Sequence, residues 1–471
     1  MSAAKITSCP AVSIFSVFFM IVLRVCLVHA QLDVFEVSAF GCDPSGDMWD
    51  ITESLVKAWR QACDTKDGIV VIPRGTFSLN TVTLDGPCNG STTFVLNGNL
   101  KAPIDISEMG KDSQSWMLFL NMKDLFIIGR GSFDGQGTHS WLQNQCKRYL
   151  NCKSLPTSLE LENVTNALVE GITSIDSKFF HIALRRSESI LIKNVVIQAP
   201  GYSHNTDGIH ISLSKNIIIN KADIGTGDDC ISLSQGSRNI HIYQIKCGPG
   251  HGISIGSLGN HAHEEDVSDI LVNDCTFTNT TNGARIKTWA PSFPSRVFNL
   301  TFADITLNNV TNPILIDQHY CPNSHCTSKG ESQVHISEVE FHNFTGSSPN
   351  KEAVILNCSS LMPCEAIILG ELNIRDNLGG PTMLTCTNVH GISYESASSI
   401  ICADNGIAPS GEVVGTSPVG SIGMAPSTPS PHIGAPSKEV GIAPNGVDKF
   451  APCNKVVYAP SRGRSILNYS G

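Results

Sequence analysis

The sequence predicts an all-β protein: a single-stranded parallel β-helix with a short N-terminal helical cap and a disordered C-terminal tail. Short apolar strands recur along the chain, and a second set of strands repeats in the same register. The 471 residues are 41% hydrophobic, which supplies a large core, and one all-β domain can exceed ~200 residues. The formal charge of −10 argues against a nucleic-acid partner, which needs a basic face.

The first set of strands consists of short runs of Ile, Leu, Val and Ala within residues 160–345. The residues before these runs are Asn166, Ser189, Asn216, Asn239 and Asp269, spaced by 23, 27, 23 and 30 residues. Helical repeats are disfavoured because β-branched residues dominate and Asn and Gly are frequent. A β-sandwich is the competing interpretation, but stacked coils explain the repeated register directly. The runs are residues 167–169, 190–192, 217–219, 240–242 and 270–272.

The second set of strands can be aligned at residues 207–211, 229–233, 251–255 and 284–288. Isoleucine holds the middle position of each row, and alternation along a strand predicts that these side chains point into the core. Their polar neighbours then point outward, and stacked strands lie about 4.8 Å apart. One patch on one face should therefore gather Asp207, Asp228, Asp229, His251, Arg285 and Lys287.

This patch has the residue types needed to cleave a glycosidic bond. Three crowded carboxylates repel, so at least one should have a raised pKa and serve as a general acid while another activates water. His251 could tune the proton affinity of the acid. Arg285 and Lys287 would suit a substrate that carries its own carboxylates, such as a uronic acid polymer.

Each motif also has a simpler interpretation. Gly-Asp-Asp and Asn-Thr-Asp-Gly are common turn sequences, and His251 between glycines could be a tolerated turn residue. Arg285 and Lys287 could belong to a solvated strand face. An acidic cluster can bind calcium, but calcium gains nothing from two cations nearby, so a calcium site is the second interpretation. A non-catalytic binding or structural protein remains the alternative of another class.

At these residues the sequence resembles the plant polygalacturonases, which are pectin-cleaving glycoside hydrolases. The resemblance implies a right-handed parallel β-helix of the pectin-lyase-like type. The resemblance covers roughly residues 31–403, and residues 316–323 and 326–330 look most like pollen exopolygalacturonases. His204 departs from the family pattern, which usually has Pro there. The matching stretches are residues 205–210 (NTDGIH), 227–230 (GDDC), 250–259 (GHGISIGSLG) and 285–289 (RIKTW).

The resemblance implies inverting hydrolysis of α-1,4 linkages between galacturonic acid units of pectin, without a cofactor, by a monomer. Exo action is favoured, with endo action and a calcium-dependent pectate lyase as alternatives. The roles carried over from the family are a general acid for Asp228, water activation for Asp207 and Asp229, support of the acid for His251, and substrate binding for Arg285, Lys287, Tyr320 and Asn205.

The two ends of the chain differ from this domain. Residues 1–30 read as a signal peptide, because an apolar run is followed by Val28-His29-Ala30; the run is too short for a membrane anchor. A secreted, extracellular protein is therefore expected, with no membrane contact once the leader is removed, and the resemblance implies a location in the cell wall. Residues 31–403 form the predicted catalytic β-helix, within which residues 51–63 read as the helical cap. Residues 404–471 are rich in Pro, Gly, Ser and Ala and predict a flexible tail.

The cysteines fit an oxidising compartment. Of the 17 cysteines, Cys9 and Cys26 fall in the leader, so 15 remain and at least one is unpaired within the chain. Cys453 is the expected odd residue. Close pairs predicted as disulfides are Cys321/Cys326, Cys358/Cys364 and Cys386/Cys402. Glycan acceptor motifs (Asn-X-Ser/Thr) occur at Asn89, Asn163, Asn279, Asn299, Asn309, Asn343, Asn357 and Asn468.

Overall fold

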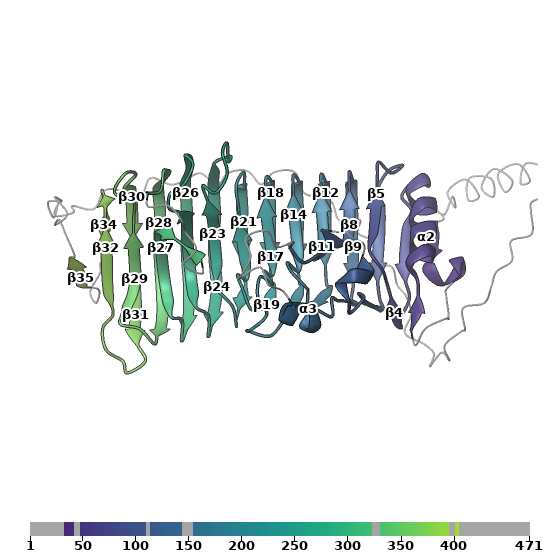
Figure 1. The fold of residues 1–471 in the computed structure, drawn as a ribbon, viewed down its shortest axis with the longest axis horizontal. Coiled ribbons are helices and arrows are strands. Elements are labelled where there is room, and N and C mark those ends of the chain that lie inside the picture. The colour runs from purple at the N-terminus through teal and green to yellow at the C-terminus, as the bar shows by residue number, and fades with distance from the viewer. Residues whose placement is uncertain are drawn as a thin grey trace, which may run out of the picture. The chain divides into compact units, whose positions relative to one another are not determined.

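The computed structural model describes residues 33–41, 48–109, 114–143, 154–322, 330–394 and 401–404. Within them the chain forms a parallel β-helix whose strands stack coil upon coil (Figure 1). The predicted leader, Cys453 and almost all of the predicted tail lie outside the described residues, so the structure does not bear on them. No helix in the described ranges is long and apolar enough to cross a membrane.

The first face of the coil carries the repeats found in the sequence. The first face starts with the short strand β1 (Val34–Glu36), which pairs with β3 (Ile69–Ile72). The face continues through the first halves of three long strands, β24 (Val267–Thr278), β26 (Ser295–Asn308) and β28 (Val334–Ser348). Its other strands are β3 (Ile69–Ile72), β6 (Thr92–Leu96), β9 (Lys123–Gly129), β12 (Thr165–Glu170), β15 (Glu188–Lys193), β18 (Lys215–Asn220), β21 (Arg238–Tyr243), β30 (Cys364–Leu369), β33 (Val389–His390) and β34 (Ser393–Tyr394).

The second face consists of shorter strands and belongs to the same sheet, because β24, β26 and β28 pair on both faces. Its strands are β2 (Trp49–Asp50), β4 (Thr76–Ser78), β7 (Asn99–Lys101), β10 (Ser132–Asp134), β13 (Thr173–Ile175), β16 (Val196–Gln198), β19 (Asp223–Gly225), β22 (Lys246–Cys247) and β31 (Leu372–Asp376).

The third face is a separate parallel sheet of 12 strands. It holds the second set of repeats and, as shown below, the candidate site. Its strands are β5 (Val82–Asp85), β8 (Ser115–Leu120), β11 (Thr157–Glu162), β14 (Ile182–Arg185), β17 (Ile209–Ser212), β20 (Ile231–Leu233), β23 (Ile253–Leu258), β25 (Asn282–Trp289), β27 (Asn312–Tyr320), β29 (Glu352–Asn357), β32 (Met383–Thr387) and β35 (Ile401–Asp404).

The register of the first face confirms the sequence prediction. Ile190, Ile217 and Ile240 are Cα partners in successive strands, and each is at most 1% exposed. The Asn, Ser and Asp residues that set the repeat lie inside the strands with φ between 52° and 59°, the left-handed region in which Asn and Asp are enriched. One such residue is needed in each coil, which is why the repeat can be recognised in the sequence.

The register of the third face corrects the predicted alignment of its fourth row. Ile209, Ile231 and Ile253 pair as expected, but Ile253 pairs with Ala284, while Ile286 pairs with Ile255. The predicted row was therefore wrong by two residues, because it matched isoleucine to isoleucine, whereas only three residues separate β24 from β25 and five separate β22 from β23. A shift of two keeps each side chain on the same face, so Ile286 is still fully buried.

The predicted helical cap is confirmed as α2 (Thr52–Asp64), which lies at the start of the stack (Figure 1). Leu55, Ala58 and Trp59 on its inner side are buried and join the hydrophobic core. The helix therefore covers apolar surface that the first coil would expose. Further helical segments in the described ranges include η1 (Val37–Phe40), η2 (Ile106–Met109) and α3 (Thr138–Gln143).

The disulfides agree with the prediction at one pair and extend it at two. Cys358–Cys364 forms as predicted, and Cys63–Cys88 and Cys230–Cys247 were not foreseen. Cys321 is disulfide-bonded, but Cys326 lies outside the described residues. Among the described cysteines, Cys275 is a free, buried thiol, so the chain holds an unpaired thiol in its core as well as any in the tail.

Candidate active site

The candidate site lies at the corner where the chain enters the third face. Asp207 precedes β17, Asp228 and Asp229 precede β20, and His251 precedes β23. Backbone hydrogen bonds join these entries, since Gly208 N–H donates to Asp229 O at 2.9 Å and His251 N–H donates to Asp228 O at 2.8 Å. Parallel stacking therefore places three successive chain segments at one point, as the sequence predicted.

Two glycines allow these segments to approach one another. A Cβ on Gly227 would lie 2.0 Å from the backbone oxygen of Ser203, so no larger residue fits before the aspartate pair. Gly252 has φ of +85°, and a Cβ there would lie 2.2 Å from Asn282 O. The glycines of Gly-Asp-Asp and Gly-His-Gly are thus required by close packing and backbone conformation.

Asp229 is the centre of the charge network and is 1% exposed. Arg285 Nη2 donates to its Oδ1 at 2.6 Å, and Lys287 Nζ donates to its Oδ2 at 2.8 Å. Ser254 Oγ also donates to Oδ1, at 2.8 Å. The negative charge is therefore fully paired in a buried position, and the two cations are fixed beside it.

Asp228 points away from this network toward His251, whose Nδ1 lies 3.0 Å from Asp228 Oδ1. Burial alone would raise the pKa of Asp228, but the hydrogen bond and charge of His251, with the charges of Lys287 and Arg285, lower it to about 2. The adjacent aspartates thus turn in different directions, as expected from the sequence. In the free site Asp228 is ionised.

Asp207 is the carboxyl with the raised pKa. Burial raises it first, and the charges of Asp228 and Asp229 raise it further, against the opposing hydrogen bond from Ser232 and the charge of Lys287. Ser232 Oγ donates to Asp207 Oδ2 at 2.5 Å. The sequence predicted that one of three crowded acids would hold its proton tightly, and in the free site that acid is Asp207.

The remaining predicted residues lie around these acids at different depths. Lys287 Nζ lies 5.4 Å from the centre of the half-buried Tyr320 ring, so Tyr320 joins the cluster. Trp289 packs against the edge of the same ring. Asn205 is exposed, in the left-handed conformation with φ of 57°. The structure thus brings seven of the eight predicted residues together, and Asn205 lies at the surface two residues before Asp207.

A metal ion is the chemical competitor at this site. Ligand atoms of Asp228, Asp229 and His251 lie within 4.8 Å of one another. Both oxygens of Asp229, however, already accept hydrogen bonds from the Arg285 and Lys287 cations. A divalent cation would have to displace one of them or sit beside both. The charge arrangement therefore favours acid–base chemistry on an anionic ligand.

Three residues of the site were missed by sequence reasoning. Ser232 donates to Asp207, His210 lies 2.8 Å from Ser232, and Ser254 lies between Asp229 and Arg285. All three project outward from the third-face strands at the positions between buried residues. That alternation was the available signal, and the aligned rows would have marked His210, Ser232 and Ser254 as one polar row.

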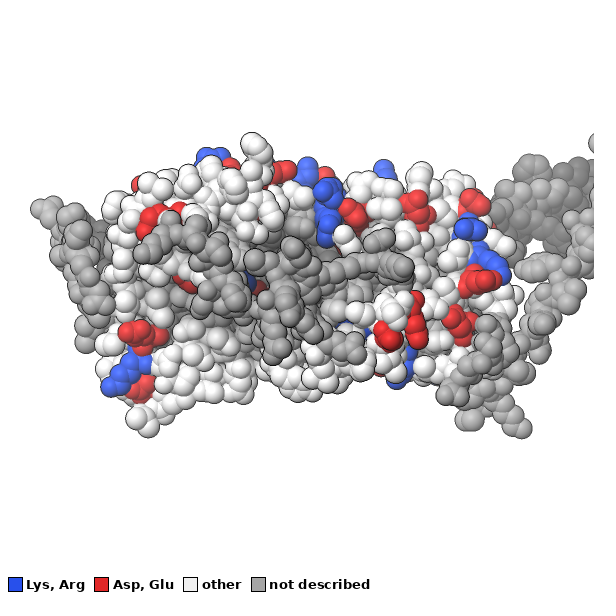
Figure 2. All heavy atoms as spheres, viewed as in Figure 1, with Lys and Arg blue, Asp and Glu red and all other residues white. Residues whose placement is uncertain are grey.

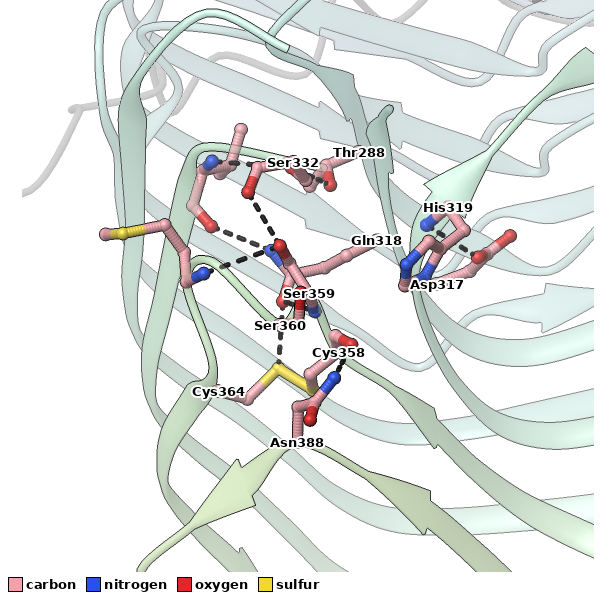
Figure 3. Close-up of a disulfide and its surroundings, with 12 residues drawn as sticks. Thr288, Asp317, Gln318, His319, Ser332, Cys358, Ser359, Ser360, Cys364 and Asn388 are labelled. Carbon is pink, nitrogen blue, oxygen red and sulfur yellow. Dashed lines mark hydrogen bonds between the residues drawn. A yellow bond between two sulfur atoms is a disulfide. The ribbon is translucent and has the colours of Figure 1, made fainter. Parts of the chain in front are cut away.

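Covalent and polar contacts hold the site strands in place. Cys230–Cys247 ties the residue after Asp229 to β22. Gln318, on the strand that ends at Tyr320, donates to Val334 O at 2.8 Å and accepts from Ser359 N–H at 3.1 Å. Figure 3 shows this buried amide beside the Cys358–Cys364 disulfide and between neighbouring coils. β27 is thereby fixed to the coil that follows it.

Charge on the outer surface is mixed. In the face shown in Figure 2, the described acidic and basic side chains lie in small groups separated by uncharged areas. Several of the ion pairs are exposed, such as Arg296–Asp266. The described part of this face has no broad basic area of the kind that binds a nucleic-acid backbone.

Comparison with known proteins places the chain in a family. The model of glycosyl hydrolases family 28 matches residues 63–401. An exopolygalacturonase of Platanus acerifolia is 42% identical over 380 residues, which are 80% of this chain and 100% of that protein. An exopolygalacturonase of Zea mays is 40% identical over 371 residues, 78% of this chain and 90% of its own length.

Solved structures show the same fold at lower identity. An endo-xylogalacturonan hydrolase from Aspergillus tubingensis has a TM-score of 0.66 at 23% identity, covering 78% of this chain and 100% of that one. A polygalacturonase from Erwinia carotovora has a TM-score of 0.62 at 22% identity, covering 77% and 97%. The match of the family model over residues 63–401 and the 42% identity to the Platanus acerifolia protein establish that the chain belongs to glycosyl hydrolases family 28.

Proposed function

We propose that the protein is a secreted polygalacturonase that hydrolyses α-1,4 linkages between the galacturonic acid units of pectin by inverting acid–base catalysis. The observation that carries the proposal is the convergence of Asp207, Asp228 and Asp229 with two cations fixed beside them. Carboxylates supply the acid and the base of glycoside hydrolysis. Arg285 and Lys287 supply the charge that an anionic sugar needs. The similarity to named exopolygalacturonases supports this substrate.

Asp228 is the proposed general acid, as the family resemblance assigns it. An acid must carry a proton, yet in the free site the pKa of Asp228 is lowered by His251 and by the Lys287 and Arg285 cations. A galacturonate carboxylate bound to Lys287 and Arg285 would offset their positive charge and raise the pKa of Asp228. Substrate binding would thereby move the proton of the carboxylate cluster toward the leaving oxygen.

Asp207 and Asp229 are proposed to hold and activate the attacking water. Asp229 is already ionic, since it pairs with Arg285 and Lys287. Asp207 becomes available as a base when the shared proton passes to Asp228. Tyr320, beside Lys287, is proposed to contact the sugar near the scissile bond, and Asn205 to contact the substrate from the surface.

Exo action is our proposal for where cleavage occurs. It is supported by relatives named exopolygalacturonases at 40–43% identity, although others of similar identity are named only polygalacturonase. A product-size time course on polygalacturonic acid tests it. Monomer alone from the earliest time is expected, and a spread of oligomers would instead indicate endo action.

Secretion is supported by the leader-like residues 1–30 and by three disulfides among the described residues. Disulfides form and persist in oxidising compartments. Processing after Ala30 followed by a monomer in solution is the expected form of the mature protein. A role for residues 404–471 in retention by the cell wall, through modified Ala-Pro and Ser-Pro units, is part of the same proposal.

The Asp228→Asn variant tests the catalytic assignment. We expect reducing-end release to fall by several orders of magnitude, because general acid catalysis alone contributes roughly 10²–10⁴-fold and the charge balance also changes. Unfolding curves of both proteins control for loss of fold. If wild type and variant both release reducing ends only at the background rate, the proposed enzymatic activity is refuted. Products that absorb in the ultraviolet, formed only without chelator, would indicate a calcium-dependent lyase.

A further inference from the structure

A chain of hydrogen bonds on the third face ends at Asp207 and is not used by the mechanism above. His210 Nδ1 lies 2.8 Å from Ser232 Oγ, and Ser232 Oγ donates to Asp207 Oδ2 at 2.5 Å. His210 and Ser232 are Cα partners on β17 and β20, so strand stacking fixes their separation. When Asp207 is ionised, the Ser232 proton goes to the carboxylate, so the Ser232 oxygen accepts from His210, which then carries its proton on Nδ1.

The His210 ring is itself held in place. It stacks on Phe180 with ring centres 4.3 Å apart and an interplanar angle of 14°, and Phe180 stacks on Phe179 at 4.0 Å. Burial, with the charge of Arg185, lowers the pKa of His210 to about 4. The imidazole is thus neutral near neutral pH, and one of its faces is covered by an aromatic ring.

We propose that His210 and Ser232 are positioning residues for Asp207: together they orient its carboxyl group and stabilise its ionised form, so that it can hold the attacking water. The inference rests on the proposed function for the reaction it serves. The hydrogen-bond chain itself does not depend on which sugar is cleaved. Both residues act through Asp207 and need not touch the substrate.

The charges around Asp207 show why this support matters. Asp228 and Asp229 face it from the entry to β20, Lys287 faces it from β25, and His210 Nδ1 lies 3.9 Å away on β17. Arg185 on β14 faces His210. Burial and the two aspartates favour protonated Asp207, while the hydrogen bond from Ser232 and the charge of Lys287 favour the ionised form. Removal of the Ser232 hydroxyl would leave Lys287 alone in that role.

The first test is the pH profile of kcat/KM for variants of the pair. In Ser232→Ala the alkaline limb, where the cluster loses its shared proton, should move up by about one pH unit, because a hydrogen bond to ionised Asp207 is gone. Ionised Asp207 then becomes rarer, so the maximum of kcat/KM should fall roughly 10-fold. Ser232→Thr keeps the hydroxyl and should restore the profile. His210→Phe should shift the limb less, and His210→Asn, which keeps a donor, should recover it.

The matched control is Ser212→Ala on β17, two residues after His210. The backbone oxygen of Ser212, rather than its hydroxyl, accepts the hydrogen bond from Ser214, so this profile should match wild type. A Ser232→Ala profile that is lowered equally at every pH, with no movement of the limb, would mean a purely structural role and would overturn the proposal.

The second test needs no activity. Nitrogen-15 chemical shifts of the His210 ring, recorded at a pH at which Asp207 is ionised, should show the Nδ1-protonated tautomer in wild type and loss of that preference in Ser232→Ala. An Nε2-protonated tautomer in wild type would overturn the hydrogen-bond chain even if the enzyme is active. Wild-type protein that leaves polygalacturonate intact would instead overturn the proposed function, and the tautomer would still decide this inference.

Discussion

Asp207 and Asp228 lie in the same cluster but have opposite pKa shifts. Each is surrounded mostly by protein, so burial acts on both in the same direction. Asp228 has His251 at hydrogen-bond distance and falls to a pKa of about 2, whereas Asp207 receives a hydroxyl and faces two carboxylates. The comparison shows that the partner, rather than depth of burial, decides which acid holds the proton.

The same contrast determines the effect of pH on folding. Asp228 has a lowered pKa, so its contribution to stability is present above the pKa of an unfolded aspartate and is lost as pH falls toward 2. Asp207 has a raised pKa, so it costs stability above that unfolded value, and the cost disappears as pH falls and the buried carboxyl takes up a proton. As pH changes, Asp207 and Asp228 therefore alter the free energy of unfolding in opposite directions.

The largest effect is expected from Asp229→Asn. This change leaves Arg285 and Lys287 buried beside a neutral side chain, and breaking a buried ion pair costs roughly 3–5 kcal/mol. Denaturant unfolding at pH 7 measures the loss. Asp266→Asn is the control because its Arg296 partner is exposed, and a surface pair contributes about 1 kcal/mol or less. Equal losses in the two variants would contradict the central role of Asp229.

The next effect has the opposite sign. Asp207→Asn removes a carboxyl whose raised pKa costs stability, so the variant should be more stable than wild type at pH 7 by about 0.5–2 kcal/mol while losing activity. The gain should shrink as pH falls, because the wild-type carboxyl then becomes neutral as well. Unfolding curves recorded at intervals of about one pH unit between pH 4 and pH 7 measure this change in the stability gain. Destabilisation across that range would contradict the assigned pKa direction.

The fold was predictable from the sequence because a coil repeats its constraints. Each turn of the helix needs buried Ile or Val at alternate positions and a left-handed residue such as Asn216 or Asn239, so the pattern recurs visibly. The fourth row of the third face was misplaced by two residues because the shift kept Ile286 inside the core. Alternation alone cannot detect an even shift.

The site was predictable only in part. Its charged residues occur in motifs, whereas Ser232 and Ser254 are common residues that gain meaning only when strands stack them beside Asp207 and Asp229. The disulfides show the same limit. Cys358–Cys364 spans 6 residues and was foreseen, while Cys230–Cys247 spans 17 and joins the corner before β20 to β22 on the second face.

A change of similar size tests the repeat itself. Asn239 is exposed, has φ of 52° and donates to Asn216 Oδ1 at 2.6 Å. Asn239→Ala should destabilise the protein by about 1–2 kcal/mol, because alanine is strained in the left-handed conformation. Asn239→Gly relieves that strain and should cost less, which separates conformation from the lost hydrogen bond. If thermal unfolding shows the glycine variant to be as unstable as the alanine variant, the side-chain ladder rather than the backbone angle selects asparagine in each coil.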